Sequence, residues 1–208
     1  MSEWSVGAPL PPAMPQFCPN LFRSWCAWWL KVCGWRLVGE FPNEARLVLI
    51  AAPHSSWWDG YWGLLFKVAT GADISFMGKR ELFRGPLGWA LRALGGIPVE
   101  RSSTHGVVDQ MVERFDTHSQ LWVGIAPEGT RKEVRAWRTG FWHIARDAGV
   151  PILPASFDYP SKTITLGPLF QVGADMHADL AALRAYYAPF RGKLRGVGVP
   201  AVPQSSRR

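Results

Sequence analysis

His54 and Asp59 are the pair of residues in this chain whose types and spacing best suit proton transfer. On a regular helix, five residues turn the chain by about 500°, which would leave the two side chains on different faces. Across a turn between a strand and a helix they can meet, and open α/β sheets place their sites in loops at the carboxyl ends of strands. Asp59 would then accept a hydrogen bond from one imidazole nitrogen and leave the other as a base for a substrate hydroxyl. Taken alone, this spacing also arises by chance.

A cationic side chain at the end of a short strand suits phosphate. The stretch Gly96–Arg101 predicts such a strand, and Arg101 offers a planar guanidinium for bidentate contact with an anion. Hydroxyl residues follow it and open a helix, whose N-terminal amides also favour an anion. Lys79, upstream, is a further candidate phosphate ligand. The alternative is an ordinary surface pair of Glu100 and Arg101 beside a capping serine.

A glycine-containing loop, Pro127–Arg131, directly follows the apolar stretch 120–126. Gly129 lets the backbone turn and approach a ligand closely. Glu128 and Arg131 either pair with each other or hold the hydroxyl and phosphate groups of a substrate. A fourth stretch, 150–154, is apolar and flanked by prolines, and alone it predicts only core.

The segments that carry these residues alternate between strand-like and helix-like patterns. Short apolar runs predict strands, and amphipathic stretches that end at glycine predict helices. Strands that alternate with helices of this length favour an α/β fold with a mainly parallel central sheet flanked by helices. The predicted strands are 46–52, 74–77, 97–99, 120–126, 151–157 and 163–166, and the predicted helices are 57–70, 81–94 with a break at Gly85–Pro86, 104–118, 139–148 and 175–187.

Residues 17–36 have the composition of a helix that lies in a membrane interface. Four tryptophans occur there among basic residues, without an acidic residue. An aromatic, basic helix too short to span a bilayer is typical of segments in the headgroup plane, and packing on the core is the alternative. We expect a flexible proline-rich stretch at 1–16, the amphipathic membrane-interface helical segment and a linker at 17–45, the α/β domain at 46–188, and a basic tail at 189–208 that is solvated or docks on anionic lipid.

Composition narrows the classes of function. A chain of 208 residues with 48% apolar and 19% charged residues is long enough for one domain with its own core. A net charge of +7 points to an anionic partner, and the 12 tryptophans favour a membrane surface over nucleic acid. Sequence patterns for a metal site, a P-loop or a serine-hydrolase elbow are missing, so no cofactor is expected. The three cysteines fit reduced packing residues, and with no secretory signal we expect the cytoplasmic face of the inner membrane.

In order and spacing, the four blocks resemble those of the glycerolipid acyltransferases of the lysophosphatidic acid acyltransferase type. That family carries H-x4-D, G-x-[IV]-x-x-x-R, F-P-E-G-[TS]-R and V-P-[IV]-x-P in this order. The chain has them at His54–Asp59, Gly95–Arg101, Ala126–Arg131 and Val150–Pro154. Pro53 stands where many members have asparagine, and the third block starts with alanine where many have phenylalanine.

This resemblance implies transfer of a fatty acyl group from acyl-CoA or acyl carrier protein to a lysophospholipid hydroxyl, most directly that of 1-acyl-glycerol-3-phosphate. It implies a single step without an acyl-enzyme, and a membrane surface on which the lipid is met. The residues it implicates are His54 as general base, Asp59 as its orienting partner, Arg101 and Lys79 for the phosphate, Glu128, Gly129, Thr130 and Arg131 for the glycerol phosphate, and Ile152 and Pro154 in support of the acyl site.

Three other interpretations stay open at this point. In the first, the protein is an acyltransferase that acts on a different lysolipid. In the second, it is a His–Asp thioesterase or lipid hydrolase with Ser55 or Ser56 as nucleophile. A membrane-binding adaptor would explain the tryptophans and the charge, but not the four ordered blocks.

Overall fold

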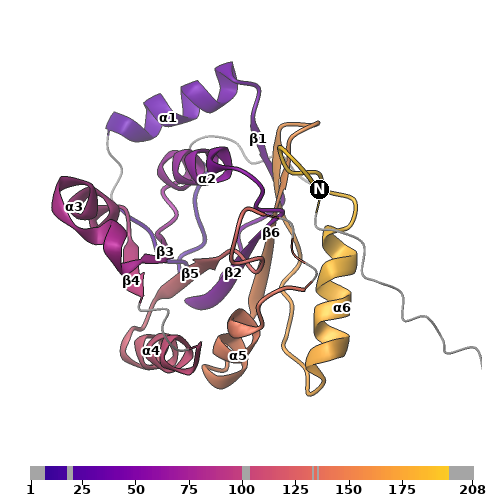
Figure 1. Cartoon of the computed structure of the whole chain (residues 1–208). Helices are drawn as coiled ribbons and strands as arrows, with labels where there is room; N and C mark the ends of the chain where they lie inside the picture. Colours follow the sequence, from indigo (N-terminus) through magenta and orange to yellow (C-terminus); the bar gives the residue numbers. More distant parts are fainter. Residues whose placement is uncertain (1–7, 18–20, 100–103, 133, 135, 197–208) are drawn as a thin grey trace, which may run out of the picture.

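The sheet is built around strand β2, Arg46–Ala52, a run of seven residues that is apolar after its first position. A computed structural model describes residues 8–17, 21–99, 104–132, 134 and 136–196 (Figure 1). The other strands are β1 Arg36–Val38, β3 Ile74–Lys79, β4 Gly96–Val99, β5 Leu121–Ile125, β6 Ile152–Asp158 and β7 Thr163–Leu166. The helices are α1 Leu21–Val32, α2 Trp57–Thr70, the 3-10 turn η1 Arg80–Phe83, α3 Gly85–Ala93, α4 Thr104–Thr117, α5 Gly140–Asp147 and α6 Met176–Tyr187.

Five neighbouring strands run parallel. The strand order is β1-β7-β6-β2-β5-β3-β4, and every pairing from β6 to β4 is parallel. Strand β7 is antiparallel to β6, and β1 is parallel to β7. The mainly parallel sheet expected from the sequence is therefore confirmed. Its parallel strands bring their carboxyl ends, and the loops that follow them, to one edge.

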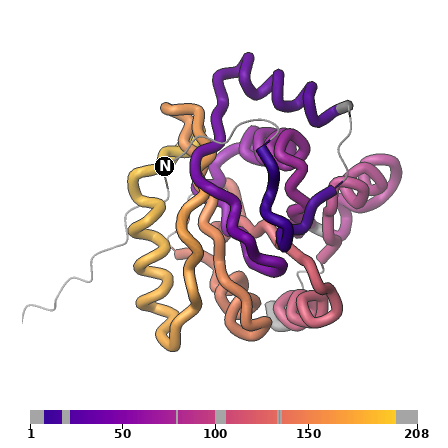
Figure 2. The backbone as a smooth tube through the Cα atoms, turned by 180° about the vertical axis from the view of Figure 1, so that it is seen from behind, coloured from indigo at the N-terminus to yellow at the C-terminus, as the bar shows by residue number. Residues whose placement is uncertain are grey.

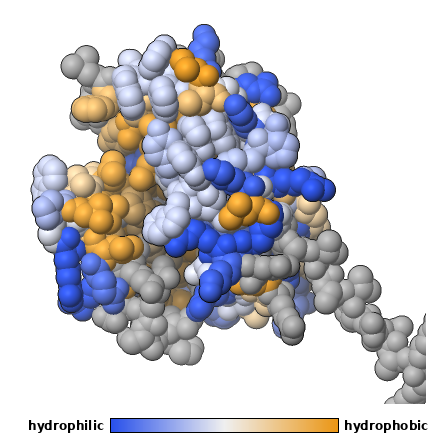
Figure 3. All heavy atoms as spheres, turned by 45° about the horizontal axis from the view of Figure 1, so that its top comes forward, coloured by the Kyte–Doolittle hydropathy of each residue, from blue (hydrophilic) through white to orange (hydrophobic). Residues whose placement is uncertain are grey.

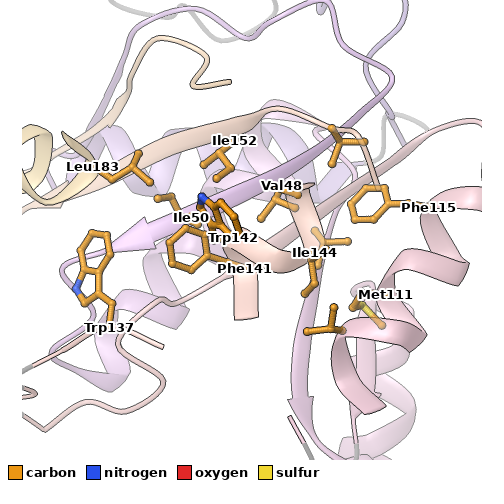
Figure 4. Packing of buried hydrophobic residues seen from close by; sticks show 14 of the residues in the cluster. Val48, Ile50, Met111, Phe115, Trp137, Phe141, Trp142, Ile144, Ile152 and Leu183 are labelled. Atoms are coloured by element: carbon orange, nitrogen blue, oxygen red, sulfur yellow. The ribbon is translucent and has the colours of Figure 1, made fainter. Parts of the chain in front are cut away.

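Alternation along β2 divides the core between two layers of helices. Val48 and Ile50 face the cluster formed with α4, α5 and α6, in which Phe115, Phe141 and Trp142 are buried (Figure 4). Leu47 and Leu49 face the opposite cluster, to which α1 and α2 contribute. Because successive side chains of a strand point to opposite faces, one apolar run supplies both layers.

Among the residues that the structure describes, no helix is both long and apolar enough to cross a bilayer.

The first strand of the sheet lies where the end of a helix and the start of a linker were expected from the sequence. Residues Arg36–Val38 form β1 and pair with Thr163–Thr165 of β7 at the edge of the sheet. Three residues are too few for a periodic pattern to stand out, and the pairing partner lies far along the chain. The break expected at Gly85–Pro86 is present, with η1 before it and α3 after it.

The proline-rich N-terminal stretch, expected to be flexible, packs on the core where it is described. Met14 is 1% exposed and belongs to the cluster beneath α1 and α2. Backbone N–H groups of Phe17 and Asp73 donate to the carbonyls of Gly71 and Pro15. Figure 2 shows this indigo segment lying against the body of the molecule. Prolines reduce the conformational entropy that such a segment loses on folding, so a proline-rich composition does not exclude an ordered path.

A buried lysine joins α2 to the start of β3 and the end of α3. The Nζ atom of Lys67 donates to the carbonyls of Ile74 at 2.8 Å and Leu94 at 2.7 Å. It also pairs with Asp73 Oδ1 at 3.2 Å. Burial lowers the pKa of Lys67, while the Asp73 carboxylate opposes that shift. The cation is thus compensated by three oxygens, and it fixes α2 relative to the strands beside it.

Two helix glycines should respond in opposite ways to an added methyl group. A Cβ atom at Gly88 would lie 2.1 Å from the backbone carbonyl carbon of Phe83, so Gly88→Ala should displace α3. We expect the free energy of unfolding to fall by about 1–3 kcal/mol. A Cβ atom at Gly60, in α2, would have no heavy atom within 4 Å. Gly60→Ala should therefore raise the free energy of unfolding by about 0.5–1 kcal/mol. Urea denaturation of both variants measures this, and equal effects would contradict the packing described.

Candidate active site

The loop between β2 and α2 brings His54 and Asp59 together. The distance from His54 Nδ1 to Asp59 Oδ2 is 3.4 Å. The Asp59 carboxylate is fully buried, whereas the imidazole is 27% exposed. The same Oδ2 accepts hydrogen bonds from the backbone N–H groups of Ser55 and Ser56, each at 2.7 Å. The turn between strand and helix therefore brings together two side chains that a regular helix would hold apart.

This geometry follows from how α2 begins. Ser56 caps the helix, and its Oγ accepts from the N–H of Trp58 at 3.2 Å. Asp59, three residues on, returns its carboxylate to the N–H of Ser56, which completes a capping box. A carboxylate in the first turn is also favoured by the positive end of the helix dipole. The helix start thus fixes Asp59, and the preceding residues carry His54 to it.

Tyr159 holds the other oxygen of Asp59, although it belongs to none of the four sequence blocks. Its hydroxyl donates to Asp59 Oδ1 at 2.6 Å, and its ring packs edge-on against Trp35. Burial and the neighbouring carboxylate raise the pKa of Tyr159 far above its ordinary value, so the hydroxyl stays a donor. The residue follows β6, the strand beside β2. Its position at the same sheet edge as His54 is the feature of the sequence that could have indicated a place in the site.

Glu128 approaches His54 from the loop after β5. It is 3% exposed, and Oε1 accepts from the backbone N–H of His54 at 2.9 Å. Oε2 accepts from Arg195 Nη2 at 2.7 Å. Burial raises the pKa of Glu128, while the N–H of His54 and the guanidinium of Arg195 oppose the rise. The carboxylate pairs with Arg195 and not with Arg131, the partner considered from the sequence.

The part of this loop that follows Glu128 is more exposed than Glu128 itself. The guanidinium of Arg131 stacks over the exposed ring of Trp57, 3.5 Å from its centroid. Thr130 is exposed, and its Oγ1 accepts from the N–H of Lys132. Gly129 has φ +64°, and a Cβ atom there would lie 2.5 Å from the side chain of Arg138. Only glycine fits this turn without strain, as its place in the motif suggested.

The remaining predicted residues are Lys79, Arg101, Ile152 and Pro154. Lys79 ends β3, at the same sheet edge, but the structure does not describe its side chain. Arg101 lies outside the described residues. Ile152 and Pro154 are buried in β6 opposite Val48 and Ile50 of β2. They pack within the core and hold β6 against the strand that ends before His54.

The C-terminal segment folds over the site as far as residue 196, where a solvated or lipid-docked tail was expected. The N–H of Leu194 donates to Ser55 Oγ at 3.1 Å. The guanidinium of Arg195 reaches Glu128 and donates to the carbonyls of Arg131 and Lys132. The sequence offered only a run of basic residues here, which does not reveal which of them turns inward.

The charges around His54 favour the neutral imidazole. Burial lowers the pKa of His54, the Asp59 carboxylate opposes this, and the guanidinium groups of Arg131 and Arg195 lower it further. An imidazole that is neutral at pH 7, held at Nδ1 by a carboxylate, is suited to take a proton at Nε2. The arrangement can therefore act as an oriented general base.

Comparisons with known proteins identify the family of this chain. The family model described as Acyltransferase matches residues 38–158. The 1-acyl-sn-glycerol-3-phosphate acyltransferase of Pseudomonas aeruginosa is 30% identical over 148 residues, covering 64% of this chain and 54% of that protein. The enzyme of the same name from Escherichia coli is 33% identical over 100 residues, covering 45% and 40%. The chain thus spans about half the length of the curated relatives it matches.

The fold is also similar to that of a solved structure. The crystal structure of the 1-acyl-sn-glycerophosphate (LPA) acyltransferase PlsC from Thermotoga maritima superposes with a TM-score of 0.60 at 16% identity, covering 79% of this chain and 74% of that one. At this identity the likeness concerns the arrangement of the sheet and its helices.

The pKa of His54 provides a test of the site that needs no substrate. In an NMR titration of the histidine rings, His54 should titrate below 6.5, because burial and two guanidinium groups outweigh Asp59. Asp59→Asn should lower its pKa further, because the group that raises it is removed. The resonance is assigned from its loss in His54→Asn. A titration at or above 6.5 in the unmodified protein would contradict the electrostatics described.

Proposed function

Because the chain belongs to the acyltransferase family, we propose that it transfers a fatty acyl group from an acyl thioester to the hydroxyl of a lysophospholipid. The acceptor we propose is 1-acyl-sn-glycerol-3-phosphate, the substrate in the names of both curated relatives. The observation that carries the proposal is the oriented pair of His54 and Asp59 at the carboxyl edge of the sheet, 3.4 Å apart.

In the proposed reaction, the acceptor hydroxyl displaces the thiol of the thioester directly. Nε2 of neutral His54 takes the proton of the acceptor hydroxyl as its oxygen bonds to the thioester carbonyl carbon. The carbon–sulfur bond then breaks, and the leaving thiolate takes that proton from the imidazolium. Asp59 holds the ring and stabilises its cationic form during the transfer. The products are the diacyl lipid and the free thiol of CoA or acyl carrier protein.

The two serines beside His54 argue against a hydrolase that forms an acyl-enzyme. Ser55 is 1% exposed, and its Oγ accepts from the N–H of Leu194. The Oγ of Ser56 caps α2. A nucleophile must reach the substrate carbonyl with a base within hydrogen-bond distance, and both hydroxyls are engaged in holding the backbone. Direct transfer to an external hydroxyl needs neither of them.

The acceptor phosphate needs cations that are free to approach it. We assign this role to Arg131, and the resemblance to the family adds Lys79 and Arg101 as further ligands. Arg131 lies on the exposed face of Trp57, where release from the stacking interaction costs only about 0.5–1 kcal/mol. Glu128 is assigned to positioning instead, since both oxygens already accept from protein donors and its charge would repel a phosphate.

The site opens beside an aromatic surface that suits a bilayer. Large apolar side chains are exposed on α1 and at the start of α2: Phe22, Trp25, Trp28, Val32, Trp57, Trp58 and Tyr61. They are linked, because Trp25 stacks on Trp29, Trp29 donates to the Tyr61 hydroxyl, and Tyr61 packs edge-on against Trp58. Figure 3, turned toward this end, shows hydrophobic and hydrophilic residues side by side. We propose that this face contacts the membrane from one side.

Activity should depend on His54 and on an acceptor. Thiol release from acyl-CoA and from acyl carrier protein thioesters should require lysophosphatidate, and His54→Ala should lower it by ~10²–10⁴-fold without unfolding the protein. His177→Ala, at an exposed position on α6, serves as the matched control. Release without an acceptor would identify a thioesterase, and release only with a lysolipid that lacks phosphate would change the acceptor. A fully active His54→Ala protein would overturn the mechanism.

Vesicle binding should depend on the exposed tryptophans of α1. Replacement of Trp25 and Trp28 by serine should weaken binding to vesicles that contain phosphatidylglycerol by at least about tenfold, because two half-exposed rings leave the interface. Replacement of both by phenylalanine should retain most of the binding. Sedimentation with vesicles measures it. Unchanged binding of the serine variant would show that another surface makes the contact.

A further inference from the structure

The C-terminal segment reaches the site from outside the part of the chain that the acyltransferase family model matches. That match ends at residue 158, whereas Arg195 lies 67 positions beyond Glu128 and binds it. The side chain of Arg195 is only 20% exposed. A long cationic side chain is seldom buried to this extent without a partner of opposite charge. The contact therefore needs an explanation that neither the motifs nor the family match supplies.

We propose that Arg195 is a positioning residue of the acyl-transfer site, which acts through Glu128 to hold the backbone of His54 in place. This inference rests on the proposed function for its kinetic consequence. The chain of contacts is short: Arg195 Nη2 donates to Glu128 Oε2 at 2.7 Å, and Glu128 Oε1 accepts from the N–H of His54 at 2.9 Å. The base thus has two anchors, with Asp59 on its ring and Glu128 on its backbone.

The charge of Arg195 keeps Glu128 in a form that can hold His54. Glu128 is almost fully buried, and burial disfavours its carboxylate. A buried carboxylate that loses its cationic partner takes up a proton or rearranges, and either change disturbs the bond to His54. Asp59 and Arg131 also act on His54, but they come from the loops of the motifs themselves. Arg195 adds a charge from a separate segment.

The guanidinium also joins the two loops that form the site. It donates to the carbonyls of Arg131 and Lys132 in one loop and lies 3.4 Å from the carbonyl of His54 in the other. A guanidinium presents its N–H donors in a rigid fork, and here both terminal nitrogens donate to protein oxygens. Arg195 therefore differs from Arg131, whose stacked guanidinium is accessible. Its loss should change turnover and not the affinity for the acceptor phosphate.

Steady-state kinetics test this assignment. Arg195→Met should lower kcat by ~10–100-fold with little change in KM for lysophosphatidate, because the base is misplaced and the phosphate ligands remain. Arg195→Lys, which keeps the charge, should retain part of the rate. Arg191→Met is the matched control, since it removes the same charge from an exposed position of the same segment. A raised KM with unchanged kcat would make Arg195 a phosphate ligand and overturn the proposal.

A double-mutant cycle tests whether Glu128 transmits the effect. Glu128→Gln keeps an oxygen that can accept from His54 but needs no cation. In that background Arg195→Met should cost less than about threefold in kcat, because no unpaired carboxylate is left behind. An equal cost of Arg195→Met in both backgrounds would show that Arg195 does not act through Glu128.

Hydrogen exchange at single amides tests the positioning role of Arg195 without any measurement of turnover. In Arg195→Met the N–H of His54 should lose protection, because its acceptor is Glu128. The N–H groups of Ser55 and Ser56 should keep theirs, because they bind Asp59. Unchanged protection at His54 would overturn the proposal. If the unmodified protein transfers no acyl group while His54 alone loses protection, the proposed function fails and the positioning contact stands.

Discussion

The buried carboxylate of Asp59 is the group on which the site depends. It accepts from two backbone N–H groups of its own loop and from the hydroxyl of Tyr159, and it lies 3.4 Å from His54. Burial of a carboxylate at 0% exposure is costly unless hydrogen-bond donors compensate it, as they do here. The same interactions begin α2, end the loop after β2 and hold the residue that follows β6. Stability and chemistry therefore rest on one set of hydrogen bonds.

A second buried carboxylate, that of Glu128, also contacts His54. Asp59 orients the imidazole ring, and Glu128 holds the backbone of the same residue. Each is compensated by a group from later in the chain, Tyr159 in one case and Arg195 in the other. The Asp59 carboxylate raises the pKa of His54. Burial and the guanidinium groups offset this, so the imidazole stays neutral and able to accept a proton.

The aromatic surface and the loop that carries His54 belong to one end of the molecule because α2 adjoins both. Its first residues include Trp57 and Trp58 on the outside and Asp59 on the inside. Arg131 lies over the ring of Trp57, and Lys193 lies over the ring of Trp58. Cations are therefore present at the border between the aromatic surface and the site. A lipid with an anionic headgroup would meet both kinds of contact within a short distance of His54. This continuity is the physical basis for proposing a substrate that resides in a bilayer.

The sequence by itself determined the parallel sheet, most helix and strand bounds, and the loops that carry His54, Asp59 and Glu128. These features depend on local periodicity and on the rule that parallel strands end at one edge, so they can be predicted without coordinates. Tertiary structure alone decided that Tyr159 reaches Asp59 across 100 positions and that Arg195 reaches Glu128 across 67. It also placed Met14 in the core and β1 in the sheet. Contacts between distant segments leave no periodic pattern, because they depend on where the folded chain places each residue.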